Sequence, residues 1–476
     1  MRLKEIDKRW FQHLILLSAP LLTVIDVFIV NVAIPSIKKG LGATNGEIQL
    51  IIAMYLLGYA SFQIVGGRAG DHFGRKKVFF MGMLFFTITS CFCGLATTAS
   101  ELIIARFFQG VSGAFMLPQA LSYVQILFPL PNERTKAIGL IGFTMGVASI
   151  LGQFLGGYLS GVYFIVEGWR LIFFINLPVG LIALAATAKY LHESEKNRSG
   201  KFDYPGVGIL TSGLMSLIYP LIIGREKGWP LWSVCLLTSS LLIFAYFIYN
   251  QKKKLAENRS YLINMQLFRI KDFNIGIMLV AFYFMMHTSY LLICTVYFQN
   301  GLHISAYQSG LYFVFFGIFF TLSSLLSIRL VNTFGKRALQ AGPPIVIVTF
   351  IIQSILFLPG IKPSYIYVLM SFYGLGGGLV LPSLINMALK SVPHHFAGAA
   401  AGVYNTCQQV ASSLGISIIG GVFYSVLGSD NTGSSYHKAF CYGLTLEIFC
   451  LIVVIVLLYL LPDIKSKKME ASIATH

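Results

Sequence analysis

The sequence GRAGDHFGRKK, residues 67–77, lies between two long apolar runs and combines glycines, one aspartate and a cluster of basic residues. A weaker copy, RLVNTFGKR at residues 329–337, lies between two later apolar runs, with Asn332 at the position of Asp71. A basic, glycine-containing hairpin that recurs in two hydrophobic halves is typical of membrane transporters built by internal duplication. The stretch therefore predicts two related helical repeats.

The composition is that of an integral membrane protein. The chain has 476 residues, of which 56% are hydrophobic and 11% charged, and its mean hydropathy is +0.74. A soluble protein of this balance could not cover itself with polar surface. Apolar runs of about 18 to 25 residues, each able to cross a bilayer as a helix, predict an all-α protein with about fourteen spans. The predicted spans lie near residues 13–35, 48–67, 78–97, 102–126, 137–161, 170–189, 205–223, 231–249, 273–297, 309–328, 341–358, 364–389, 398–426 and 440–461.

The net charge of +17 is explained by topology. An even number of spans puts both termini on one side of the membrane, and alternate loops share that side. Most Lys and Arg residues lie in these segments, so the positive-inside rule places both termini in the cytoplasm. We therefore expect no nucleic-acid partner.

The sequence offers no sign of bound metal or catalysis. Its seven cysteines are scattered without metal-ligand spacing, and we interpret them as small core residues. No Walker motif is present, and the spans contain no Ser/His/Asp set or acidic pair. We expect no cofactor, no metal, no ATP-driven step and no enzymatic activity.

Two six-span repeats flank an inserted pair of spans. Pro118 and Pro382 occupy matching positions in the two halves, which supports the duplication suggested by the hairpins. We divide the chain into an N-terminal six-helix repeat at 1–190, an inserted two-helix segment with charged linkers at 191–271, and a C-terminal six-helix repeat with a short cytoplasmic tail at 272–476.

Several further stretches match the signatures of one family. They are IDVFIVNVAIP at residues 25–35, RFFQG at 106–110, WRLIFFINLPVG at 169–180, FDYPG at 202–206 and LFRIKDF at 267–273. Together with the 67–77 hairpin they resemble the major facilitator superfamily, and within it the fourteen-span drug:proton antiporter family. The resemblance covers nearly the whole chain and implies the major facilitator fold.

Two charged residues lie within predicted spans. A carboxylate such as Asp26 costs on the order of 2.5–3.5 kcal/mol at a helix centre, so it should face a cavity or a partner. We expect it to handle protons or a cationic substrate; the alternative is a static helix–helix hydrogen bond. Arg106 could pair with Asp26 or with substrate, or it could reach the outer headgroups instead.

The 67–77 hairpin is the candidate cytoplasmic gate, formed by Gly67, Asp71, Gly74, Arg75 and Lys76. Glycines let helices approach closely or turn sharply. By resemblance, Asp71 holds a latch that closes the cytoplasmic face, whereas the basic run can equally be a topology anchor.

The fifth span carries Gly152, Gly156 and Gly157, and glycines at this spacing form a groove for a second helix. The resemblance makes this groove the hinge between the repeats, although the family has a proline where this chain has Gln153. Plain close packing is the alternative.

Two weaker candidates lie in the second half. The repeat places His287 at the position equivalent to Asp26, where it is either a second titratable group or a structural histidine. Glu447 lies inside the last predicted span, either as a structural or interfacial group or as a second acid for protons or cationic substrates.

The resemblance implies proton-coupled efflux of small amphipathic or cationic compounds by alternating access, a multidrug antiporter of the bacterial cytoplasmic (inner) membrane. Its partners would be a small-molecule substrate, protons and the lipid bilayer, and we expect a monomer, with or without a periplasmic accessory protein. The alternatives are a proton-coupled transporter of one metabolite, such as a siderophore, amino acid or sugar, and a non-transporting membrane receptor.

Overall fold

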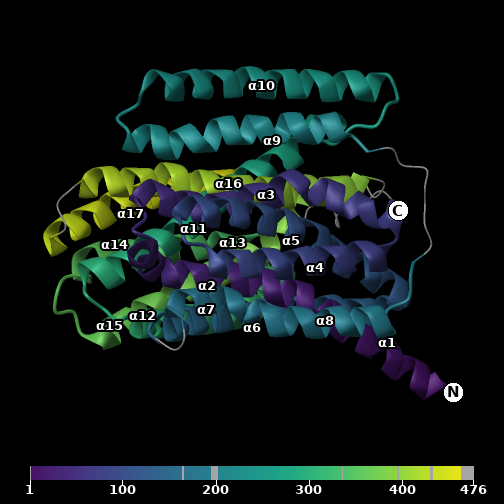
Figure 1. The fold of residues 1–476 in the computed structure, drawn as a ribbon, viewed down its shortest axis with the longest axis horizontal. Coiled ribbons are helices and arrows are strands. Elements are labelled where there is room, and N and C mark those ends of the chain that lie inside the picture. Colours follow the sequence, from purple (N-terminus) through teal and green to yellow (C-terminus); the bar gives the residue numbers. More distant parts are fainter. Residues whose placement is uncertain are drawn as a thin grey trace. The chain divides into compact units, whose positions relative to one another are not determined.

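The structure is a computed structural model. It describes residues 2–162, 166–194, 202–334, 336–389, 391–393, 396–428 and 432–461. These residues form helices and no strand, as the apolar runs predict, and Figure 1 shows the long helices. Gly335, in the weaker hairpin copy, lies outside the described residues.

The chain forms two compact units, Met1–Asn264 with Ser305–Gly310, and Met265–Ile304 with Leu311–His476. The first unit contains α1 (Arg2–Leu16), α2 (Ser18–Leu41), α3 (Asn45–Phe73), α4 (Arg75–Leu95), α5 (Ala99–Leu127), α6 (Pro131–Ser160), α7 (Gly168–Phe174), α8 (Asn176–Tyr190), α9 (Tyr204–Tyr219), η1 (Pro220–Gly224) and α10 (Leu231–Ala256). The second contains η2 (Met265–Arg269), α11 (Lys271–Val296), η3 (Tyr297–Gly301), most of α12 (Ala306–Phe334), α13 (Arg337–Gln340), α14 (Gly342–Leu356), α15 (Pro363–Leu389), α16 (Ala397–Leu427) and α17 (Gly433–Leu460). The three-part division expected from the sequence stays a prediction.

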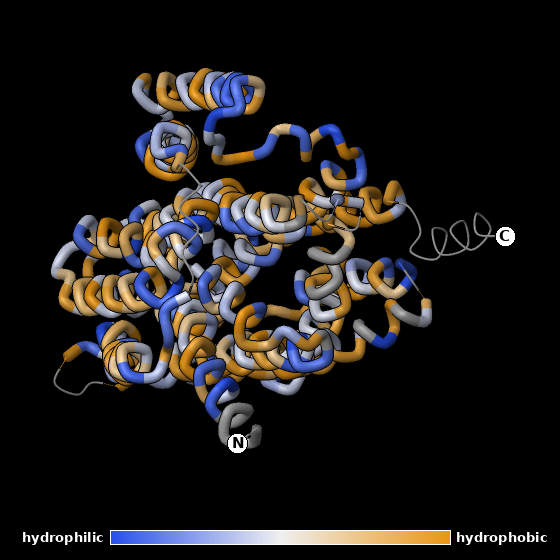
Figure 2. Tube along the Cα trace, turned by 90° about the vertical axis from the view of Figure 1, so that its right-hand side faces the viewer, coloured by the Kyte–Doolittle hydropathy of each residue, from blue (hydrophilic) through white to orange (hydrophobic). Residues whose placement is uncertain are grey.

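Every predicted span is helical. Among the described residues, 13 helices are long and apolar enough to cross a membrane. The remaining predicted span is α5, whose hydropathy is lowered by Arg106 and three glutamines. Figure 2 shows apolar residues along most helices and hydrophilic ones mainly in the connecting segments. The predicted span outside these 13 therefore carries a buried arginine.

Local sequence signals set the ends of the helices that build the site. Thr44 and Thr98 begin α3 and α5 with complete capping boxes, in which the threonine side chain accepts from the third residue of the helix and that glutamate reaches back. Gly74 separates α3 from α4 with φ of 101°, a conformation that side-chain-bearing residues rarely adopt. The hairpin at 67–77 therefore turns at Gly74.

The inserted pair, α9 and α10, is joined by a buried polar cluster. Figure 1 shows the two helices side by side. Gln251 of α10 is fully buried, donates to Asp203 Oδ2 at 2.8 Å, and accepts from the backbone N–H groups of Leu262 and Ile263 at 2.6 and 3.0 Å. Burial alone would raise the pKa of Asp203, but hydrogen bonds, first of all from Lys254, outweigh it and hold that pKa below its ordinary value. Asp203 therefore stays ionised and holds the start of α9 against the end of α10.

Replacing Gln251 with Ala should destabilise the protein, because it leaves two backbone N–H groups and Asp203 short of partners. Each buried group left unsatisfied costs about 1–3 kcal/mol. We expect a lower unfolding temperature in detergent, followed by tryptophan fluorescence. Lys252→Ala, at an exposed neighbour, is the control, and equal unfolding temperatures for the two variants would contradict this role of Gln251.

Candidate functional site

The first unit contains a fully buried ion pair. Asp26 of α2 and Arg106 of α5 have 0% and 1% exposed area, and Arg106 NH1 donates to Asp26 Oδ2. Arg106 therefore reaches inward to the carboxylate and not outward to the headgroups. Each charge stabilises the other, because loss of one partner would leave the other as an uncompensated buried charge.

Neutral polar side chains complete the bonding of Asp26. Oδ1 accepts from Gln109 Nε2 at 2.8 Å and from Asn176 Nδ2 at 3.3 Å. Gln109 in turn accepts from Arg106 NH1 at 2.7 Å, and Asn176 donates to Ser90 Oγ at 2.9 Å. The carboxylate thus joins α2, α5 and α8 in one network, which we call the Asp26 cluster.

Arg106 has further partners on α3. Its Nε donates to the Ile51 carbonyl at 3.4 Å, and its guanidinium carbon lies 4.2 Å from the centre of the Tyr55 ring. A desolvated cation over an aromatic face gains about 2 kcal/mol. Arg106 therefore keeps favourable contacts that do not depend on the charge of Asp26.

Gln109 and Asn176 lie within stretches that carried the family resemblance, RFFQG and INLPVG, but no role was predicted for them. A neutral amide inside a span gives no signal as strong as that of a charge. A search for Asn and Gln residues on the predicted span that contains Arg106 could have found Gln109.

The hairpin carries its own ion pair. Arg75 NH2 donates to Asp71 Oδ1 at 2.8 Å, and Arg75 NH1 donates to the Ser122 carbonyl at 3.1 Å. Asp71 is half exposed. Within the first unit, Asp71 is therefore bound to its own hairpin and through Arg75 to α5. Its role as a latch stays a prediction.

A residue that the sequence did not single out caps the start of α4. The Glu193 carboxylate accepts from the backbone N–H groups of Lys76 and Lys77 at 3.0 and 3.2 Å, and Ser194 Oγ accepts from the Arg75 N–H at 3.1 Å. A carboxylate at a helix N-terminus satisfies free donors and complements the helix dipole. The hairpin is thus tied to the segment that follows α8.

Glycines next to Gly67 provide the close approach of α3 to α5. A Cβ at Gly66 would clash with the Ala114 carbonyl, and one at Gly70 would clash with Gln119. A Cβ at Gly67 would meet only Pro118, at an ordinary 3.8 Å. The tight contacts therefore lie at Gly66 and Gly70, and not at Gly67, where the sequence predicted close approach.

The predicted hinge glycines lie on α6. Gly152 and Gly156 pack against the Ile25 and Ile29 carbonyls of α2, where a Cβ would be 2.9 and 2.6 Å away. Gly157 faces the segment 305–310 of the same unit. Close packing is thus present at all three positions, and the hinge role stays a prediction.

His287 lies in an aromatic environment in the second unit. Its exposed area is 7%, its Nδ1 is 2.7 Å from the Tyr373 hydroxyl, and its ring lies near those of Tyr283 and Phe316. No acidic partner of His287 is present among the described residues. His287 is therefore a buried, hydrogen-bonded group of α11, and its equivalence to Asp26 stays a prediction.

Glu447 of α17 has 0% exposed area, and its Oε1 is 3.0 Å from Ser289 Oγ of α11. Its other oxygen, Oε2, has no hydrogen-bond partner. Glu447 therefore lies in the interior of its unit and not at its surface.

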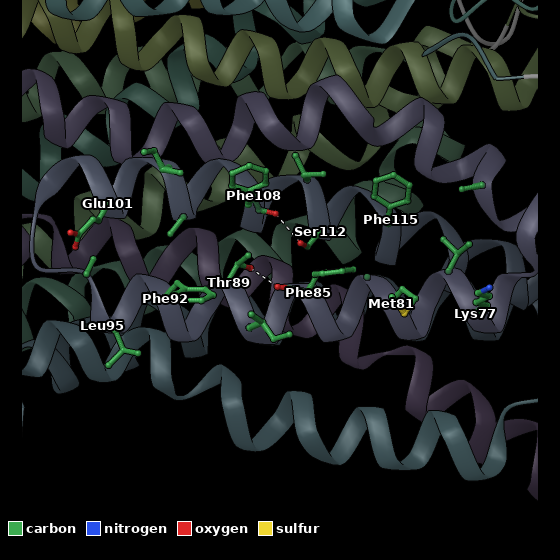
Figure 3. Close-up of a pocket in the computed structure, with 18 of the residues that line it drawn as sticks. Lys77, Met81, Phe85, Thr89, Phe92, Leu95, Glu101, Phe108, Ser112 and Phe115 are labelled. Carbon is green, nitrogen blue, oxygen red and sulfur yellow. Dashed lines mark hydrogen bonds between the residues drawn. The ribbon is translucent and has the colours of Figure 1, made fainter. Parts of the chain in front are cut away.

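An open apolar groove runs along α4 and α5, with a volume of about 870 Å³. Figure 3 shows aromatic side chains along it, with Lys77 at one end and Glu101 at the other. Phe92 and Phe108 are 60% and 54% exposed, as expected of residues that face hydrocarbon, and the Asp26 cluster does not line the groove. We therefore interpret the groove as a surface that faces lipid and not as the substrate site. No group of three potential metal ligands occurs among the described residues.

The model of the Major Facilitator Superfamily matches residues 16–416. The chain therefore belongs to this superfamily, as its motifs predicted. It is 31% identical over 431 residues to the "Probable actinorhodin transporter" of Streptomyces coelicolor, covering 90% of this chain and 74% of that protein. It is 29% identical to the "Puromycin resistance protein pur8" of Streptomyces alboniger, covering 87% and 81%. It is also 27% identical to the "Multidrug resistance protein Stp" of Mycobacterium tuberculosis, covering 85% and 74%.

Solved structures agree on the fold. A D-xylose–proton symporter matches with a TM-score of 0.65 and 16% identity, covering 93% of this chain and 97% of that one. A bacterial homologue of the lysosomal transporter Spinster, inward-facing, matches with a TM-score of 0.65 and 16% identity, covering 95% and 96%. As a member of the Major Facilitator Superfamily, the protein is a multi-pass membrane transporter of small molecules and not an enzyme.

Replacing Glu193 with Ala should expose the first amides of α4 to solvent, because it removes the acceptor of two N–H groups. Loss of a cap costs about 0.5–2 kcal/mol. We expect faster hydrogen exchange in the peptide that spans residues 75–78, measured by mass spectrometry, and His192→Ala at the adjacent exposed residue as a neutral control. Unchanged exchange in this peptide would show that Glu193 does not cap α4.

Asp26→Asn should lower the unfolding temperature markedly, because Arg106 then lacks its counter-charge and breaking a buried pair costs about 3–5 kcal/mol. The double variant Asp26→Asn/Arg106→Gln, which buries no charge, should recover much of that loss. Both are measured by thermal unfolding in detergent, with Lys39→Gln at an exposed site as the charge control. Additive losses in the double variant would count against the pairing.

Proposed function

We propose that the protein exports small amphipathic or cationic compounds in exchange for protons, by alternating access across the bacterial cytoplasmic membrane, with both termini in the cytoplasm. The observation that carries this proposal is the buried Asp26–Arg106 pair. A carboxylate inside a span is costly and is functional by default, and this one has a partner that stays protonated. Relatives named "Tetracenomycin C resistance and export protein" and "Multidrug resistance protein Stp" support outward transport of such compounds.

Protonation of Asp26 would change the charge of its cluster. With both residues ionised the pair is neutral, and a proton on Asp26 leaves a net charge of +1 on Arg106. That charge repels a cationic compound, so a proton taken from outside would release the substrate there. Loss of the proton to the cytoplasm would restore the neutral pair and permit loading.

Arg106 also has contacts that do not depend on Asp26, and these support the proposed cycle. Arg106 keeps Gln109, the Ile51 carbonyl and the Tyr55 face when Asp26 is neutral. The guanidinium thus retains hydrogen-bond and ring contacts in both states, and the cost of protonating Asp26 is the loss of its counter-charge. In the same proposal, the Asp71 hairpin times the cytoplasmic gate and the α6 glycines form the hinge.

A second candidate is export of one particular compound. Relatives such as the "Cephamycin export protein CmcT" of Amycolatopsis lactamdurans, 30% identical over 437 residues, are named for a single antibiotic. A dedicated exporter would use the same proton cycle with a narrower substrate site.

Ethidium efflux tests the proposal. In energised cells that lack their main pumps, the protein should expel ethidium and unrelated cationic dyes, and a protonophore should stop this export. Asp26→Asn/Arg106→Gln, expressed at the same level in the membrane, should show no proton-driven efflux. Efflux that resists the protonophore would refute proton coupling, and competition by only one native compound would favour the dedicated exporter.

A further inference from the structure

We propose that Glu447 is a second proton-binding group of the transport cycle, held as a neutral carboxylic acid in the second unit. This inference rests on the proposed proton-coupled export and adds a site to it. It follows from two observations. The Ser289 hydroxyl has one proton for three acceptors within reach, and no cation lies near Glu447 in the described part of the chain.

The Ser289 hydroxyl has one proton and three acceptors within reach. Its Oγ lies 2.7 Å from the Met285 carbonyl, 3.0 Å from the Met286 carbonyl and 3.0 Å from Glu447 Oε1. A hydroxyl donates only one hydrogen bond but accepts two. If the proton of Ser289 goes to the shortest contact, Met285, then the bond to Glu447 requires a proton on Glu447, which donates to Ser289 Oγ.

The opposite assignment is unfavourable. If Ser289 donates to Glu447, the carboxylate holds a full charge on a single hydrogen bond, because Oε2 has no partner. An isolated carboxylate in an apolar interior normally takes up a proton instead of staying charged. Both assignments of the Ser289 proton therefore favour the neutral acid.

No basic side chain among the described residues compensates Glu447. The helices α14, α15 and α16 contain no Asp, Glu, Lys, Arg or His. On α17, His437 and Lys438 lie about 14 Å away along the helix at 1.5 Å per residue, and Lys336 contacts the far end, at Leu461, about 21 Å away. The charged residues of α11, Lys271 and Asp272, lie at its first turn.

The titratable groups that face Glu447 are neutral or weakly acidic. They are Cys294 of α11, Tyr373 of α15 and Cys450 of α17. Tyr373 also binds His287 Nδ1 at 2.7 Å. Since none of these groups supplies a positive charge at neutral pH, only a proton can neutralise Glu447, and ionisation requires that water or substrate reach it. A proton would therefore enter or leave this site only in a conformation that opens it.

This arrangement differs from the Asp26 cluster in one respect that matters for coupling. Asp26 is neutralised by Arg106 without a proton, whereas Glu447 is neutralised by the proton itself. Glu447→Gln reproduces the neutral acid in shape and hydrogen bonding, so this variant should fold and bind substrate.

The first test is infrared difference spectroscopy of the purified protein at neutral pH. Subtraction of the Glu447→Gln spectrum from the wild-type spectrum should show the C=O stretch of a protonated carboxylic acid, sensitive to deuterium exchange. Ser289→Ala should shift this band without removing it. A carboxylate band in its place would overturn the inference, whether or not the protein couples transport to protons.

The second test uses proteoliposomes loaded with ethidium. Glu447→Gln should abolish the part of export driven by a pH gradient while retaining ethidium exchange at equal pH, and Glu447→Asp should keep part of the coupled export. Proton-driven export at the wild-type rate in Glu447→Gln would overturn the inference alone. Absence of proton-driven export in the wild type would overturn the proposed function instead.

Discussion

An ionised carboxylate and a guanidinium are costly in a hydrocarbon interior unless they neutralise one another, and the first unit is organised around this constraint. Asp26 and Arg106 come from α2 and α5 and have almost no exposed area. Their remaining bonding capacity is filled by Gln109, Asn176 and the Ile51 carbonyl. The helices that supply these partners cannot separate without exposing a charge to lipid, so the pair fixes their register as well as their proximity.

Close packing of the helices follows from the same constraint. Arg106 of α5 donates to the Ile51 carbonyl of α3, and glycines let the two backbones approach closely beside this contact. Gly110 faces the Tyr55 carbonyl and Gly58 faces the Phe107 carbonyl, so each helix presents a glycine to the other's backbone. Apolar association alone gives little specificity among helices in a bilayer; small residues and a buried polar network supply it.

The sequence predicted features that depend on composition or on local pattern. Hydropathy located the spans, the 67–77 motif located the hairpin, and a charge within an apolar run identified Asp26. Features that depend on distant residues were not predicted: Glu193 caps α4 across more than a hundred residues, and nothing in its own surroundings marks it. The tight glycine contact was assigned to Gly67, because spacing along one helix does not reveal which face meets the neighbouring helix.

The two units bury their acids in physically different ways. In α2 the carboxylate has a permanent counter-charge, so its cluster is neutral when the acid is ionised. In the second unit, the position predicted to be equivalent holds His287, and a buried acid, Glu447, lies on α17 against Ser289. In the proposed cycle, a proton would therefore charge the first cluster and neutralise the second. In this proposal, two sites with opposite responses to the same ion would let a proton gradient favour a different conformation on each side of the membrane.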